Sequence, residues 1–262
     1  MPHRSMFLRL GAACLGLAVV IAVCAPALAA QKAKAVPDIW GIWIGVGNGE
    51  GYDPKFRNEP WPTSPDFTPW GAEESKRLAS PVTPGECNPW SPQHFMAGSS
   101  LFPTQILQGS NQIVLHYEGI NQPRRIYTDG RKHPPKDEWL PSFLGHSIGH
   151  WEGDTLVVDT VGTNGRARPM NGYVSGAVFS PVETTPRLPS SDQLHLVERI
   201  RLVGKGGYLE DTMTIEDPKT YRKPFTVKRY WQRRPDLDLY EYVCDDNDRP
   251  DAEGQIPAGT TR

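Results

Sequence analysis

Residues 193–234, QLHLVERIRLVGKGGYLEDTMTIEDPKTYRKPFTVKRYWQRR, contain three runs in which apolar and polar residues alternate. A period of two is typical of strands that face a core on one side and water on the other. The turn-forming sequences GKGG at residues 204–207 and DP at residues 217–218 separate the three runs. This stretch therefore predicts three consecutive strands joined by short turns.

Similar short runs fill the chain from residue 112 onward, and one more lies at residues 38–47. No segment of helical length intervenes between the later runs, which excludes parallel βαβ units. The sequence predicts an all-β fold, an antiparallel lipocalin-like meander barrel of about nine strands, with a compact sandwich as the alternative. The expected strands are residues 38–47, 112–119, 124–130, 147–151, 155–162, 193–204, 208–217, 223–234 and 237–244.

Glycine and proline, 25 and 26 of the 262 residues, argue against a helical bundle or a coiled coil because both residues interrupt helices. The proline-rich residues 50–67 and 81–105 are expected to form loops. One short helix is expected at residues 69–79, where Thr68 would cap the N-terminus and Pro69 would occupy the first turn. We expect one barrel domain over residues 38–248, with a disordered leader at 30–37 and a disordered tail at 249–262.

The overall charge is nearly balanced, with 28 basic and 30 acidic residues and a formal net charge of −2. This balance gives no reason to expect nucleic acid as a partner. The sequence has no P-loop, dinucleotide fingerprint or HExxH motif. We therefore expect no cofactor and no metal.

Residues 1–29 have the pattern of a secretory signal peptide. Arg4 and Arg9 precede an apolar run from Leu10 to Cys24, and Ala27 and Ala29 supply small residues for cleavage. An uncleaved membrane anchor is the alternative, because the run is nearly long enough to span a bilayer. The sequence thus predicts an exported protein, periplasmic or secreted, without a membrane span after cleavage.

Cleavage would remove Cys14 and Cys24 and leave Cys87 and Cys244. Two cysteines in an oxidising compartment indicate one disulfide, with two free buried thiols as the alternative. In the chain-entropy model such a long loop closure stabilises the fold by roughly 4–5 kcal/mol.

Four expected strands each place one charged residue on an otherwise apolar face: Glu198, Asp211, Arg229 and Glu241. Buried charge is costly unless it is paired or lines a polar cavity. One interpretation is a structural ion-pair network in which acids clamp Arg229. The other is a ligand cavity whose carboxylates act as acid or base while Arg229 stabilises an anion.

His146 and His150 stand four residues apart, about 13 Å along a strand, which is too far for the two to share a metal ion. His146 is a candidate acid or base at the mouth of the cavity, and a structural histidine with satisfied hydrogen bonds is the alternative. The sequence GHSIG at residues 145–149 matches a nucleophile elbow at Ser147, but a turn and a strand follow it where the elbow requires a helix.

Several aromatic residues suit a pocket for an aromatic or apolar ligand, and they suit ordinary core packing equally well. The candidates for ligand contact are Trp43, Tyr127, Trp151 and Trp231. The basic residues Arg124, Arg125, Arg131 and Lys132 are expected to form a solvated hairpin.

Five sequence blocks resemble a large family of bacterial exported proteins of unassigned function. They are RRIYTDGR (124–131), GHSIGHWEGDTLVVDT (145–160), LHLVERIR (194–201), IEDPKTYRKPFTV (215–227) and EYVCDDN (241–247). The pattern Asp38-x-x-Gly41-x-Trp43 also resembles the first strand of lipocalin-like barrels, in which the tryptophan closes one barrel end. The first resemblance implies relatedness and export but brings no established chemistry.

These observations favour a small-molecule-handling barrel. One hypothesis is a cofactor-independent lyase, isomerase or hydrolase that acts on a small organic compound, for example an aromatic one. Its catalytic groups would be His146, Glu198, Asp211, Arg229 and Glu241. The alternative hypothesis is a non-catalytic lipocalin-like carrier of an apolar ligand.

Overall fold

The structure is a computed structural model that describes residues 36–46, 52–78, 88–95, 102–119, 123–167, 170–171 and 187–242. The description below concerns the unit Ala35–Arg262. The expected signal peptide, most of the leader, the tail at 249–262, Cys87 and Cys244 lie outside the described residues.

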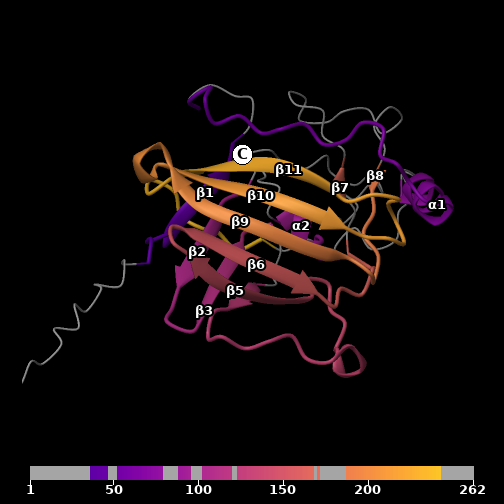
Figure 1. Ribbon diagram of the computed structural model, residues 1–262. Helices are drawn as coiled ribbons and strands as arrows, with labels where there is room; N and C mark the ends of the chain where they lie inside the picture. The colour runs from indigo at the N-terminus through magenta and orange to yellow at the C-terminus, as the bar shows by residue number, and fades with distance from the viewer. Residues whose placement is uncertain are drawn as a thin grey trace, which may run out of the picture. The chain divides into compact units, whose positions relative to one another are not determined.

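Nine strands form a closed barrel in the ring order β1-β11-β10-β9-β6-β5-β4-β3-β2 (Figure 1). The predicted all-β barrel is therefore confirmed. A separate two-stranded sheet joins β7 (Met170–Asn171) to β8 (Arg187–Leu188). The barrel strands are β1 (Gly41–Gly45), β2 (Thr104–Gln108), β3 (Gln112–Tyr117), β4 (Arg124–Tyr127), β5 (His146–Glu152), β6 (Thr155–Val161), β9 (His195–Val203), β10 (Tyr208–Glu216) and β11 (Phe225–Arg233).

The alternation in the sequence places one face of each strand inside the barrel. In β9, Leu196, Glu198 and Ile200 are buried, whereas Arg199 and Arg201 are exposed. Antiparallel pairing aligns the inner faces of neighbouring strands, because Met213 of β10 lies opposite both Glu198 and Val227. The resulting core consists mainly of leucine, isoleucine, valine and tryptophan side chains.

One pair of neighbours, β4 and β5, runs parallel, with Ile126 opposite Ser147. The prediction of antiparallel pairing throughout was wrong here, although the other neighbours in the ring pair antiparallel. Strand direction cannot alternate all the way round a closed ring of odd number, so nine strands require at least one parallel pair. Residues 128–145 consequently run back along the barrel to reach the start of β5, and they include a 3-10 turn at Lys136–Glu138.

One barrel strand was missed and one expected strand is not found, so the number of barrel strands is still the nine that were predicted. Strand β2 lies at the edge of a region that the sequence predicted to be loop, and it was missed. Residues 237–244 were expected to form the last strand, but no strand occurs over 237–242, the part of that segment that the structure describes. Because β1 pairs with both β11 and β2, the ring closes and leaves no edge for a further strand.

Helix α1 (Pro69–Leu78) confirms the helix predicted at residues 69–79. Its N-terminus is capped by Thr68, whose Oγ1 accepts a hydrogen bond from the Gly71 backbone N–H at 3.0 Å. The helix lies beside β8 (Figure 1), where the Ser75 hydroxyl donates to the Arg187 carbonyl at 2.7 Å. A second, single-turn helix is α2 (Pro92–Phe95).

Among the described residues, no helix has both the length and the apolar character needed to cross a membrane.

Trp43 is fully buried at the end of the barrel where β11 finishes. Its indole N–H donates to the Ile39 carbonyl at 3.0 Å, and the Arg233 guanidinium lies 4.4 Å from the ring centroid. Arg233 also donates to the carbonyls of Trp40 and Asp38, at 2.7 and 2.9 Å. The contacts around Trp43 thus tie the first strand to the last at this end of the barrel.

Candidate functional site

The inside of the barrel carries a belt of polar side chains. Six strands that follow one another round the ring, β4, β5, β6, β9, β10 and β11, each contribute one inward-facing, buried polar residue to this belt. The residues, in that order, are Arg124, Ser147, Thr160, Glu198, Asp211 and Arg229. Three of the four inward charges that the sequence predicted therefore do lie inside.

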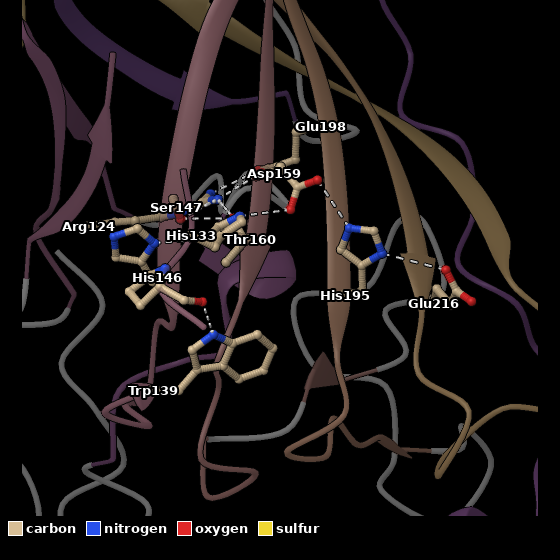
Figure 2. A network of polar contacts seen from close by, with 11 residues as sticks. Arg124, His133, Trp139, His146, Ser147, Asp159, Thr160, His195, Glu198 and Glu216 are labelled. Atoms are coloured by element: carbon tan, nitrogen blue, oxygen red, sulfur yellow. Dashed lines mark hydrogen bonds and ion pairs between the residues drawn. The ribbon is translucent and has the colours of Figure 1, made fainter. Parts of the chain in front are cut away.

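Arg124 and Glu198 form a two-pronged ion pair in this belt (Figure 2). The Arg124 Nη1 donates to Glu198 Oε1 at 2.8 Å, Nη2 contacts Oε2, and both side chains are almost completely buried. The expectation that Arg124 belongs to a solvated hairpin was wrong. Arg124 and Ile126 share one face of β4, so the alternation in RRIY already contained the signal for burial.

Ser147 is occupied by the same network and is not placed as a nucleophile. Its hydroxyl lies 2.8 Å from Thr160 Oγ1, and the Arg124 Nη2 donates to that Thr160 oxygen at 3.0 Å. Ser147 is 1% exposed and is followed by the rest of β5, with no helix after it. The resemblance of GHSIG to a nucleophile elbow therefore has no structural counterpart here.

Asp211 and Arg229 behave differently from the Arg124–Glu198 pair. They lie opposite each other on β10 and β11 and are 3% and 6% exposed. Within the described residues, both carboxylate oxygens of Asp211 and the Nε and Nη2 of Arg229 are buried without a hydrogen-bond partner. The guanidinium of Arg229 lies 4.2 Å from the ring centroid of Trp61. This pair therefore keeps hydrogen-bonding capacity that the protein itself does not use.

Burial changes the protonation of this second pair. It raises the pKa of Asp211 well above the usual value for a carboxyl group, and the nearby Glu198 charge raises it further, against the opposing effects of Arg124 and Arg229. Burial also lowers the pKa of Arg229, which the carboxylates of Glu59 and Asp211 partly offset. A protonated Asp211 would leave Arg229 with no anion of its own inside the barrel.

The four aromatic residues that were predicted to contact a ligand do not all lie on the same face of the barrel wall. Trp43 and Trp231 are buried inside, and the half-buried Trp151 packs against the same core. The Trp231 indole N–H is a further buried donor without a partner among the described residues. Tyr127 lies outside, stacked on His146 with ring centroids 5.3 Å apart.

His146 also lies on the outer face, where it belongs to a chain of five titratable side chains (Figure 2). The Nδ1 atoms of His133 and His146 are 2.8 Å apart, and the Nε2 of His133 lies 3.0 Å from Asp159 Oδ1. The second oxygen of Asp159 lies 3.2 Å from the Nε2 of His195, whose Nδ1 is 3.5 Å from Glu216. We call these five residues the histidine–carboxylate chain.

The pKa values of the two end histidines of this chain, His195 and His146, are shifted in opposite directions. Asp159 and Glu216 raise the pKa of His195, and His195 and His133 in turn lower the pKa of Asp159. At the other end, burial and the charges of His133 and Arg131 lower the pKa of His146. His195 therefore holds a proton more readily than His146 does.

The structure does not bring all five predicted catalytic residues together. Glu241 is exposed and lies outside any strand, so its predicted place on an inner face was wrong. His146 is separated from Glu198, Asp211 and Arg229 by the barrel wall, because it points outward next to the inward Ser147. No pattern in the sequence pointed to His133, which lies in the return segment between β4 and β5.

The described residues contain no group of three or more histidine, cysteine, aspartate or glutamate side chains arranged to hold a metal ion. No protein-family model matches the chain, and no curated protein matches it at a significant level.

Proposed function

We propose that this protein is an exported, lipocalin-like barrel that binds a small organic anion inside the barrel, next to Arg229 and Asp211. The observation that carries the proposal is the buried hydrogen-bonding capacity of these two side chains, which no described residue satisfies. Buried polar groups in folded proteins are nearly always paired, with protein, water or ligand. A bound ligand would supply the missing partners.

The charge balance of the interior favours an anion. Arg124 and Glu198 neutralise each other, which leaves Asp211 and Arg229 to decide the local charge. The raised pKa of Asp211 favours its protonated form, which can donate a hydrogen bond. Arg229 then supplies the positive charge of this pair, which the exposed Glu59 partly offsets. A carboxylate would accept hydrogen bonds from both side chains, and Trp61 and Trp231 offer apolar surface for an aromatic part.

Export is proposed from the N-terminal sequence. The charged, apolar and small-residue regions of residues 1–29 follow the order of a secretory signal. The resemblance to bacterial exported proteins supports the same compartment. A carrier for small organic anions outside the cytoplasm would need no nucleotide cofactor.

A second candidate is a cofactor-independent acid–base enzyme, and one observation favours it. A carboxyl group that is kept protonated by burial can act as a general acid, and Asp211 has this environment. Glu198 is less suited to that role because the ion pair with Arg124 occupies it. The Asp211→Asn variant separates the two candidates: a carrier keeps affinity for its ligand, whereas an enzyme loses turnover of a compound that it still binds.

Binding is tested by calorimetric titration of the purified chain with 2-naphthoate and with its neutral amide, 2-naphthamide. We expect the carboxylate to bind and the amide to bind at least about tenfold more weakly. The Arg229→Met variant should lose the preference for the carboxylate, and its thermal unfolding shows whether the fold is intact. Arg125→Gln is the matched control, because Arg125 is the exposed neighbour of Arg124 on β4.

Two results would overturn the proposal. One is equal affinity for the carboxylate in the wild type and in a folded Arg229→Met variant. The other is a wild-type protein that binds neither probe and that, in native mass spectrometry after gentle extraction from its source, carries no mass beyond water.

A further inference from the structure

We infer that the histidine–carboxylate chain is a general-base site on the outside of the barrel, in which the Nε2 of His146 removes a proton from water. The site is independent of the interior pair Asp211 and Arg229. It lies on the outer face of β5, β6, β9 and β10 and includes one residue of the return segment, His133.

The contact between His133 and His146 fixes where protons can be. Two nitrogens 2.8 Å apart can share one proton but cannot both carry one, because two N–H groups would then face each other. If His133 donates from Nε2 to Asp159, its Nδ1 can accept from the Nδ1–H of His146. In that arrangement the Nε2 of His146 carries a lone pair.

That lone pair is available for chemistry. No hydrogen bond among the described residues engages the Nε2 of His146, and the side chain is partly exposed. The aromatic ring of Tyr127 is stacked against the imidazole, and Arg131 lies over the same tyrosine ring, 3.8 Å from its centroid. The Arg131 guanidinium already donates three hydrogen bonds to Asp129, so Arg131 acts here mainly as a flanking cation.

The carboxylates support the base when it becomes charged. As Nε2 of His146 takes up a proton, the proton on its Nδ1 can shift toward His133, whose Nε2–H faces the negative Asp159. His195 holds the other oxygen of Asp159, and Glu216 faces His195, which keeps the Asp159 carboxylate oriented. A base held by a second group that is itself oriented by a carboxylate is the arrangement that activates nucleophiles in hydrolases.

Water is the nucleophile that this geometry can activate, and a small activated aryl ester is the probe that reports its attack. The water oxygen bonds to the ester carbonyl carbon while its proton passes to the Nε2 of His146. The tetrahedral intermediate then breaks the carbon–oxygen bond to the aryl oxide, which takes the proton back from His146. One ester and one water give one carboxylic acid and one phenol, and no oxidant or cofactor is required.

The test is hydrolysis of 4-nitrophenyl acetate by the purified full chain. The reaction is measured as the rate of 4-nitrophenol release over a range of pH. We expect His146→Ala to lower kcat/KM by about 10²-fold, the low end of the usual contribution of a general base. His150→Ala is the matched control, because His150 lies on the same outer face of β5 and its Nε2 lies 3.1 Å from Glu152, away from the histidine–carboxylate chain. It should hydrolyse the ester as the wild type does.

Asp159 is a positioning residue, so its variant needs a readout other than rate. Asp159→Asn removes the charge that stabilises protonated imidazole, and the pH at which the rate is half-maximal should therefore fall. Glu152→Gln, next to the control histidine, should leave that midpoint unchanged.

Three outcomes would overturn the inference. The first is a His146→Ala variant as active as the wild type. The second is an equal loss in His146→Ala and His150→Ala, which is the behaviour of unconnected surface histidines. The third is a ¹⁵N spectrum in which both Nδ1 atoms of His133 and His146 carry a proton at neutral pH.

Discussion

Arg124 and Glu198 meet across the inside of the barrel from strands β4 and β9, which β5 and β6 separate in the ring. The hydroxyls of Thr160 and Ser147, on the two strands between them, line the path of the guanidinium. One ion pair thus ties four strands together from within. Because the pair is fully buried, its worth depends on both partners being present.

Removal of one partner should be costly. Glu198→Gln leaves the Arg124 charge buried without its anion, and we expect a loss of about 3–5 kcal/mol in the free energy of unfolding, measured with urea. The control is Glu152→Gln at the exposed pair with Arg199, also 2.8 Å long, which should cost less than about 1 kcal/mol. Equal losses in the two variants would contradict this account of the interior.

Asp211 should make the barrel less stable as the pH rises. Its pKa in the folded state is raised above the unfolded value, so its contribution is present below about pH 4 and is lost as the pH rises through the folded pKa. Asp211→Asn should remove this decline and be more stable than the wild type at alkaline pH. Urea unfolding of both proteins at pH 5 and pH 8 measures the effect, and a variant less stable at both pH values would refute it.

His195 should give a pH dependence at higher pH. Asp159 and Glu216 raise its pKa in the folded state, so the stability it contributes is full below about pH 6 and is lost as the pH rises through the raised pKa. The difference in Tm between the wild type and His195→Gln should therefore be larger at pH 6 than at pH 9. A difference that is the same at both pH values would argue against the ion pairs of His195.

The cap of α1 can be tested separately from the barrel. The Thr68 hydroxyl accepts from the Gly71 N–H and donates to the Lys219 carbonyl at 2.5 Å. Thr68→Ala should lower the free energy of unfolding by about 1–2 kcal/mol. Thr63→Ala, at an exposed position in the preceding segment, should leave it nearly unchanged. If the two variants unfold together, the cap does not stabilise the helix.

The fold was predictable where alternation was long. Strands β9, β10 and β11 are each nine residues long, and in each the inward face repeats at every second residue over most of its length. The sequence therefore placed Glu198, Asp211 and Arg229 on the inside correctly. Strand β2 has only five residues, and its pairing with β1 joins segments about sixty residues apart. A strand this short is defined by its pairing with the neighbouring strands β1 and β3. A local sequence pattern does not show that pairing.

The candidate site was predictable only in part, for a related reason. Arg124 carried a readable signal, because Ile126 shares its face, but a strand of four residues gives weak evidence of direction. The hydrogen-bond partner of His146 is His133 of the return segment, which links it to Asp159 of β6, whereas the sequence suggested that His146 would act with the interior acids. The path of residues 128–145 along the barrel decides which of their side chains lie against a strand. The parallel pairing of β4 and β5 requires this path.

The parallel pair β4–β5 has a consequence for how the outer site could be altered. An even ring with a tight hairpin between these strands would need no residues 128–145, and it would therefore lack His133 while keeping His146, Asp159 and His195. The odd number of strands thus obliges the chain to carry a segment outside the sheet, and that segment supplies the residue linking His146 to a carboxylate. Changes in the length of this segment would alter the position of His133 in the outer histidine–carboxylate chain. The inward-facing residues of the neighbouring strands would keep their positions.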